Sequence, residues 1–378
     1  MIYLNNAATS WPKPESVYKA VDACLRQATF NPGRSNQAHA QFAGAFVDEA
    51  RSTLGRLIGA AATQIIWTRN ATEAINLALK GLLNPGDHVI TSQMEHHAVF
   101  RPLQRLVKLG VEVETIETDP ASGISLSALE KALRANTRLV VLCHASNVLG
   151  TINPIALAGL ITRSKGIPLL VDAAQTAGIL PIDVKQMNIS MLAMAGHKSL
   201  LGPQGTGALY FEEGLELRPL IEGGTGSYAE QWEQPLQIPD RYESGTLNLP
   251  GIAGLGAGLQ FIADTGLAKI RSHENRLVEQ FINGLSKHPR ISISGPPPSI
   301  ERASVVSFSI DGWDPQDVAT ILDDTFDIVV RAGLHCAPSA HQLAETLPKG
   351  SVRISPGFFN TPEQIENALE AVLTIARS

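Results

Sequence analysis

Short apolar runs alternate with amphipathic segments through the first two thirds of the chain. Buried strands are expected where about four to eight apolar or β-branched residues follow one another, and helices where apolar residues recur every three or four positions. The expected strands are residues 65–68, 88–91, 111–116, 139–143, 168–171 and 191–195, and the expected helices include 72–79, one opening at Glu95, and 126–133. This alternation predicts an α/β domain with a largely parallel sheet.

The pattern changes after about residue 250. Long helices are expected first, then strands at 305–310 and 328–330, a helix near 318–322 and a closing helix that ends at Ser378. This order is typical of a smaller α+β domain. We expect residues 14–250 to form the large domain, and residues 1–13 with 251–378 to form the small one.

The composition narrows the class of protein. The 378 residues are 44% hydrophobic and carry 36 acidic against 30 basic side chains, a balance with no electrostatic footprint for nucleic acid or an anionic membrane surface. No apolar run approaches the ~20 residues of a membrane helix, and the start lacks the pattern of a signal peptide, so a cytoplasmic protein is expected.

The three cysteines are too few and too scattered for a disulfide framework or a paired-cysteine zinc site, and no metal is expected. Cys24 lies on the apolar face of a predicted helix and Cys143 in a predicted strand, so both are expected to be buried. Cys336 lies in a loop beside His335 and near Arg331. It could react as a thiolate, or it could be a small buried hydrophobe.

The strongest chemical signal combines an acid and a lysine at neighbouring strand ends. Asp172 ends the apolar run 168–171, and Lys198 follows the run 191–195 in a glycine-rich turn. Separately, the acid could cap a helix and the lysine could be a solvated loop charge. Together they indicate pyridoxal 5′-phosphate (PLP): the lysine would bond the aldehyde and the acid would keep the pyridine nitrogen protonated. Gln175 could reach the ring hydroxyl.

Other polar residues follow strands of the same predicted sheet. Ala71 and Thr72 open a helix, whose unpaired amides suit a phosphate. His96, at another strand-to-helix junction, could stack on a flat ring and move protons. Asn147 could hold the ring hydroxyl or a substrate carboxylate, and the planar guanidinium of Arg353 suits a carboxylate.

These segments resemble fold-type I PLP enzymes, in particular the class V aminotransferase group that contains the cysteine desulfurases and selenocysteine lyases. The matching residues are Asp172-Ala-Ala-Gln175, Gly196-His197-Lys198 with Gly202-Pro203, the helix start at Thr72, Asn147, and the loop Arg331 to Pro338. The resemblance extends from Leu4 to Asn360. The compact cysteine loop is similar to that of the second desulfurase group.

The resemblance implies roles for the site residues. His96 would stack on the cofactor, His197 would contribute to cofactor binding, and Thr246 would contact the phosphate from the partner subunit of a homodimer. Asn6, Ala7 and Arg331 would contact substrate, Arg353 would grip its carboxylate, and Cys336 would carry a persulfide. Two departures matter: Ala195 replaces a Ser or Thr that bonds the phosphate, and Gln37 replaces a His.

The sequence therefore predicts a PLP-dependent cysteine desulfurase that converts L-cysteine to L-alanine and passes sulfur from Cys336 to an acceptor protein, as in iron–sulfur cluster assembly. Three alternatives stay open at this point. They are a selenocysteine lyase, a carbon–sulfur lyase or aminotransferase that needs Lys198 without Cys336, and a non-catalytic sulfur-relay scaffold.

Overall fold

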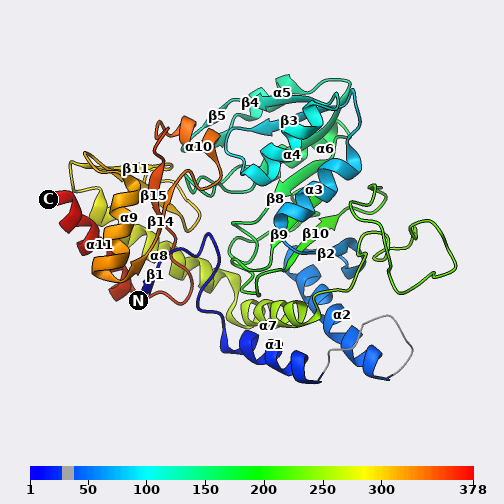
Figure 1. Ribbon diagram of the computed structural model, residues 1–378. Helices are drawn as coiled ribbons and strands as arrows, with labels where there is room; N and C mark the ends of the chain where they lie inside the picture. Colours follow the sequence, from blue (N-terminus) through cyan, green and yellow to red (C-terminus); the bar gives the residue numbers. More distant parts are fainter. Residues whose placement is uncertain (28–37) are drawn as a thin grey trace.

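The computed structural model describes residues 1–27 and 38–378 (Figure 1). The breaker cluster at 31–35 and the expected family contact at Gln37 lie outside the described residues. Within the described residues, no helix is both long and apolar enough to cross a membrane.

A seven-stranded sheet forms the centre of the molecule. Its order is β2-β10-β9-β8-β7-β3-β4, and β10 alone runs antiparallel to its neighbours. The strands are β2 (Ile65–Thr68), β3 (His88–Ser92), β4 (Glu112–Ile116), β7 (Thr137–Cys143), β8 (Leu169–Asp172), β9 (Met191–Ala195) and β10 (Gly207–Phe211). The predicted α/β class with a mostly parallel sheet is confirmed.

Helices cover both faces of this sheet. Along β8, Leu169 and Val171 pack into one apolar core and Leu170 packs into the other, because alternate residues of a strand point to opposite faces. The covering helices include α2 (Ala38–Ile58), α3 (Ala71–Leu82), α4 (His97–Val107), α5 (Leu126–Ala132), α6 (Ile155–Ser164) and α7 (Leu249–Thr265). α7 also packs against α1 (Glu15–Gln27), where Cys24 is buried as predicted (Figure 1).

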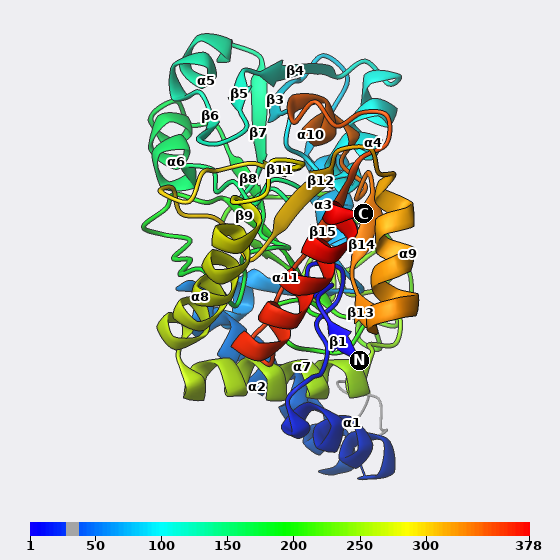
Figure 2. The same cartoon turned by 90° about the vertical axis from the view of Figure 1, so that its left-hand side faces the viewer.

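A second sheet of four strands, in the order β11-β12-β15-β14, lies beside the first (Figure 2). Its strands are β11 (Ile291–Ser294), β12 (Val306–Ile310), β14 (Arg331–Gly333) and β15 (Ser351–Ile354), and the surrounding helices are α8 (Leu267–Leu285), α9 (Pro315–Phe326), α10 (Pro338–Leu343) and α11 (Pro362–Arg377). An apolar core of its own lies between this sheet and α8, α9 and α11.

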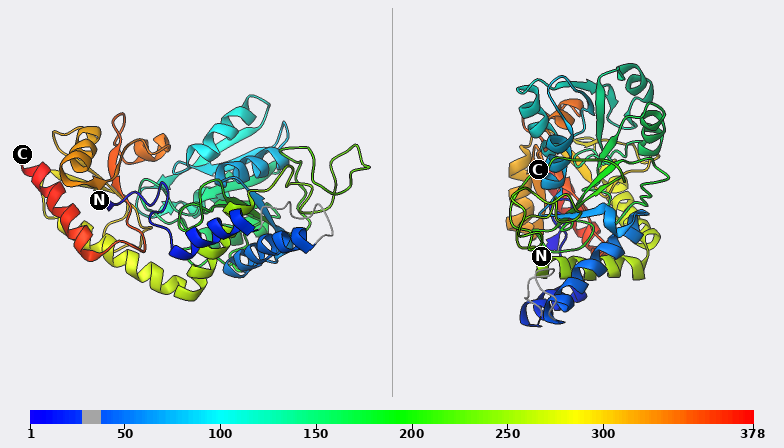
Figure 3. Two further views of the ribbon diagram at one scale, coloured as in Figure 1. Left: turned by 60° about the horizontal axis from the view of Figure 1, so that its bottom comes forward. Right: turned by 90° about the vertical axis from the view of Figure 1, so that its right-hand side faces the viewer.

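Both ends of the chain lie in this smaller part (Figures 1 and 3). β1 (Ile2–Tyr3) pairs in parallel with β13 (Ile328–Val329), so that Ile2 lies opposite Ile328. From β1 the chain passes to the large sheet through residues Asn5–Lys13, which we call the strap. The predicted boundaries of the two domains stay a prediction.

Candidate active site

A cavity of about 220 Å³ lies at the carboxyl ends of the parallel strands, where open α/β sheets bind their ligands. It is lined by Ala7, Ala8, Asn70, Ala71, Thr72, Met94, His96, Ala98, Cys143, Ala145, Asn147, Asp172, Ala174, Gln175, Ala195, His197, Lys198, Arg331 and Arg353. Most of the residues that the sequence singled out therefore share one cavity.

Asp172 and Lys198 meet in this cavity. Asp172 is the last residue of β8, and the backbone amide of Ala174 donates to its Oδ1 at 2.9 Å. Burial raises the pKa of Asp172, while that amide and Lys198 oppose the rise. Burial lowers the pKa of Lys198 to about 8, partly offset by Asp172. A buried acid with one amide partner has the capacity to accept a ring N–H, and the lysine is a competent nucleophile near pH 8.

The strap holds the backbone of Lys198. Ser10 donates through its hydroxyl to the Lys198 carbonyl at 2.8 Å, and its amide donates to the His197 carbonyl at 3.0 Å. The ammonium of Lys13 donates to the same His197 carbonyl at 2.8 Å, and burial lowers the pKa of Lys13 to about 8. The sequence analysis did not predict this contact of Lys13, although Pro12 and Pro14 on either side of it restrict the backbone there.

Two arginines bring further positive charge. Arg331 and Arg353 lie directly opposite each other on the antiparallel strands β14 and β15, an arrangement that is destabilising for like charges. Arg353 is 1% exposed; its Nη1 donates to the Asn147 carbonyl at 2.9 Å and its Nη2 to Asn5 Oδ1 at 3.2 Å. Burial, and secondarily Arg331, lowers the pKa of Arg353 to about 9.

Negative charge is scarce in this cavity. Asp172 is the single carboxylate among its described lining residues, against Lys198, Arg331 and Arg353. Because a buried cation without a counter-charge is costly, this excess suits anionic ligands. A phosphate and a substrate carboxylate together would supply the missing charge.

A phosphate can bind where α3 begins. The first amides of a helix have no partner within it, and Ala71 and Thr72 place theirs at the cavity wall. His197 Nδ1 is buried without a hydrogen-bond partner on the same wall. Ala195 also lines it and contributes no hydroxyl. With Asp172 and Lys198, these groups fit PLP, whose phosphate, ring nitrogen and aldehyde would each find a partner.

His96 has a fixed tautomer. It precedes α4, and its Nδ1 accepts the Ala98 amide at 3.0 Å, so any proton of the neutral ring sits on Nε2. Burial and then Lys198 lower the pKa of His96 to about 3. The helix was expected to open at Glu95, and it begins two residues later because this ring caps it.

Cys336 lies beside the cavity in the turn that follows β14, the strand that carries Arg331. Arg331 Nη2 is 3.5 Å from Cys336 Sγ, and the amide of His97 donates to the Cys336 carbonyl at 2.8 Å. The loop therefore brings a thiol next to the cations of the cavity. Cys143 is buried as predicted, and it also lines the cavity, which its strand pattern did not foretell.

The remaining predicted site residues differ in whether they line the cavity. Ala7 lines the cavity, and its carbonyl accepts from Gln175 Nε2 at 3.1 Å. Asn6 lines a separate small cavity, and its side chain donates to the Ser355 carbonyl at 3.0 Å. Thr246 is exposed and lies at a hollow on the outer surface. Within this one chain, Asn6 and Thr246 are therefore outside the cavity lining.

Glu95 is a buried acid that the sequence analysis did not weigh. Its Oε1 accepts from the Ser92 hydroxyl at 2.6 Å and from the Cys143 amide at 2.9 Å, while Oε2 is buried without a partner. Burial raises the pKa of Glu95 to about 8, and the charge of Asp172 contributes to the rise. Its position directly before His96 was the available signal.

Comparisons with known proteins agree with this geometry. Residues 2–368 match the family model described as aminotransferase class-V. The chain is 36% identical to a probable cysteine desulfurase of Methanothermobacter thermautotrophicus, over 99% of this chain and 94% of that protein, and 35% identical to one of Pyrococcus abyssi, over 100% and 95%. It resembles the structure of apo cysteine desulfurase from Thermococcus onnurineus, with a TM-score of 0.92, 35% identity and coverage of 100% and 94%. For the cysteine desulfurase CsdA from Escherichia coli, in its S-sulfonic acid form, the TM-score is 0.89 at 30% identity, with coverage of 99% and 94%.

Proposed function

The chain belongs to the class V aminotransferase family of PLP-dependent enzymes, with the fold-type I architecture, and we propose that it is a cysteine desulfurase. The reaction would convert L-cysteine to L-alanine and leave a persulfide on Cys336. The observation that carries the proposal is the Cys336 thiol, held by Arg331 beside a cavity that contains Lys198 and Asp172.

PLP, when bound, supplies an aldehyde that condenses with amines and a protonated ring that draws electrons from the substrate Cα. Asp172 would hold the proton on the ring nitrogen. Lys198, whose amine is readily neutral near pH 8, would accept the Cα proton. Arg353 would bind the substrate carboxylate and thereby fix the orientation of the side chain toward Cys336.

The sulfur transfer would use the thiolate of Cys336. A bond forms between Cys336 Sγ and the substrate sulfur as the Cβ–S bond breaks, and the electron pair of that bond stays on Cβ. Cβ then takes a proton and becomes the methyl group of alanine. The ammonium that Lys198 becomes by taking the Cα proton can supply a proton, and the neutral ring of His96 would donate a hydrogen bond from Nε2 that orients the substrate, because Nδ1 is occupied by the Ala98 amide.

The test is the production of alanine and sulfide from L-cysteine with a reductant, by wild type and by Cys336→Ala. We expect wild type to produce both and Cys336→Ala to lose turnover while it retains the absorbance of bound PLP. Full turnover of Cys336→Ala would instead indicate a carbon–sulfur lyase or aminotransferase. A strong preference for selenocysteine would indicate a selenocysteine lyase, and failure to take up PLP would support a scaffold.

We also propose a homodimer in which Thr246 reaches the partner's phosphate site. Its loop is anchored at Glu243, which binds Arg51 bidentately at 2.8 and 3.0 Å, and Thr246 itself is exposed. Sedimentation should give a dimer; an active, PLP-saturated monomer would contradict this. Cytoplasmic location, a sulfur-acceptor protein and a role in iron–sulfur cluster assembly stay predictions.

A further inference from the structure

The backbone that carries the reactive thiol is strained. His335 and Cys336 have φ of 48° and 60°, so two successive residues with side chains adopt the left-handed conformation. Such residues are uncommon, and strain of this kind persists only where the surroundings hold it in place. The contacts of this turn therefore determine where Cys336 Sγ lies.

Two hydrogen bonds from the large sheet's side of the cavity hold the carbonyls of the turn. Asn147 Nδ2 donates to the His335 carbonyl at 2.8 Å, and the amide of His97 donates to the Cys336 carbonyl at 2.8 Å. The His97 amide is the first of α4 and has no partner within that helix. Asn147 is 7% exposed, so water competes little for its amide.

The side chains of the turn are held from the opposite side, by the small sheet. His335 Nε2 is 3.1 Å from the Ser351 carbonyl of β15, and Arg331 of β14 contacts Cys336 Sγ. The turn is thus fastened between two parts of the molecule. Asn147 is the one side chain among the described residues that bonds a backbone carbonyl of the strained pair.

We propose that Asn147 is a positioning residue for Cys336: its side-chain amide holds the strained turn closed, so that the thiol stays next to Arg331 beside the cavity. This role rests on the proposed function of Cys336. The backbone carbonyl of Asn147 accepts from Arg353 Nη1 at 2.9 Å, so a single residue joins the proposed carboxylate-binding arginine to the thiol loop. Formation of the carboxylate site and alignment of the nucleophile therefore depend on the same residue.

The test measures alkylation of Cys336 by iodoacetamide in the PLP-free protein, with each cysteine followed by peptide mass spectrometry. In Asn147→Ala, loss of one hydrogen bond should free the turn and raise the rate at Cys336 by about three- to tenfold. Asn147→Leu keeps the branched shape, adds no charge and cannot donate, so it should give the same increase. Cys24 and Cys143, both buried, should stay unreactive and report that the fold is intact.

Ser146→Ala is the matched control. Ser146 is the neighbouring buried residue, and its hydroxyl accepts the amides of Val148 and Leu149 at 3.3 and 3.1 Å; among the described residues no hydrogen bond joins it to the cysteine loop. Its alkylation rate at Cys336 should equal that of wild type. Three outcomes would refute a specific positioning role of Asn147. They are an unchanged alkylation rate in Asn147→Ala, an equal rise of the rate in Ser146→Ala, and equal reaction of all three cysteines.

Steady-state kinetics separate positioning from substrate binding. A misplaced thiol should lower kcat for alanine formation by about tenfold or more with little change in KM, because alignment of the attacking group is lost. A rise in KM with unchanged kcat would instead assign Asn147 to carboxylate binding alone and overturn the proposal. The alkylation result does not depend on turnover, so it stands or fails separately from the desulfurase activity.

Discussion

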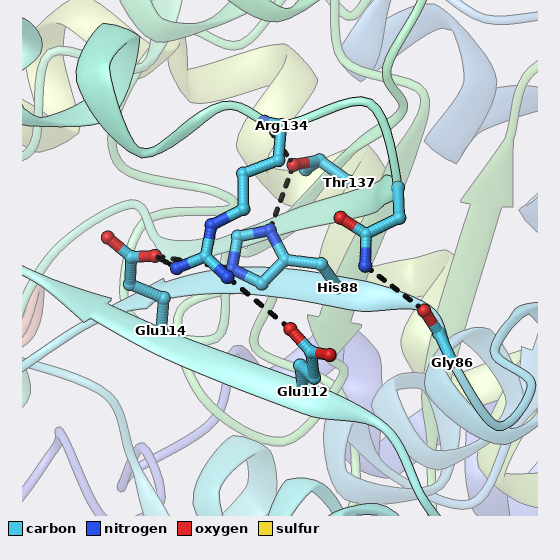
Figure 4. A network of polar contacts seen from close by, with 7 residues as sticks. Gly86, His88, Glu112, Glu114, Arg134 and Thr137 are labelled. Carbon is cyan, nitrogen blue, oxygen red and sulfur yellow. Dashed lines mark hydrogen bonds and ion pairs between the residues drawn. The ribbon is translucent and has the colours of Figure 1, made fainter.

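Two arginines, one beside the edge strand β4 of the large sheet and one on the inner strand β15 of the smaller sheet, have opposite surroundings. Arg134, half exposed at the edge of the large sheet, contacts Glu112 at 3.3 Å and Glu114, and its backbone amide donates to Thr137 beside the buried His88 (Figure 4). Arg353 on β15 is buried, and among the described residues only the neutral oxygens of Asn147 and Asn5 accept from it.

The difference separates charges that the fold satisfies from charges that await a ligand. An exposed pair such as Arg134 and Glu114 gains little Coulomb energy and costs little. Burying Arg353 opposite Arg331 costs much more, and nothing in the apolar packing requires it. The unbalanced cations therefore mark the site of ligand binding, whereas the balanced ones mark a structural edge.

The largest effect is expected when the buried cation of the cavity is removed. Arg353→Met should reduce kcat/KM for L-cysteine by about 100- to 1000-fold, because a buried charge pair with the substrate is lost. The matched Arg134→Met should leave kcat/KM unchanged. Initial rates of alanine formation measure both, and equal losses in the two variants would show that the cavity cation has no special role.

A pH series tests the electrostatic environment of Lys198. Burial lowers its pKa to about 8, so the neutral amine becomes scarcer below pH 8. Capture of PLP by the PLP-free protein, followed by stopped-flow absorbance, should slow by about tenfold for each pH unit below 8. Because Asp172 raises the pKa of Lys198, Asp172→Asn should move this profile to lower pH; a profile centred near pH 10 in wild type would contradict the desolvated site.

Glu95 extends the comparison of buried and exposed charges to an acid. Its folded pKa of about 8 lies above the ordinary value of 4.5, so the folded protein binds the extra proton in between, and stability should fall as pH rises through this window. Glu95→Gln should remove about 3 to 4 kcal/mol of this loss between pH 5 and pH 8. Urea unfolding of the PLP-free protein measures it, and parallel pH curves would refute the protonated acid.

The smallest effect is expected at the exposed edge. Glu114→Gln should change the free energy of unfolding by less than about 1 kcal/mol, and added salt should reduce the difference further. Urea unfolding at low and high ionic strength would show this. A loss of several kcal/mol in the free energy of unfolding would mean that the exposed pair of Arg134 and Glu114 supports the buried His88 in the network of Figure 4.

Much of the fold and part of the cavity follow from local sequence. Buried strands can be predicted from apolar runs. Asp172 and Lys198 lie near the ends of neighbouring strands, so it could be expected that they meet. Arg353 lies on the other sheet and Cys336 in the turn that follows its strand β14, and only the family resemblance placed them nearby. The contacts of Asn5, Asn6 and Lys13 arise from long-range packing of the strap, which has no periodic signal to read.

The pairing of β1 with β13 bears on how the protein is made. Ile2 and Ile328 are far apart in the sequence, so β1 can pair only after β13 has been synthesised. Until then the strap, whose two ends are fixed by β1 and by the carbonyls of His197 and Lys198, is held at one end at most. The segment that holds the backbone of Lys198 should therefore be among the last parts of the site to become ordered during folding.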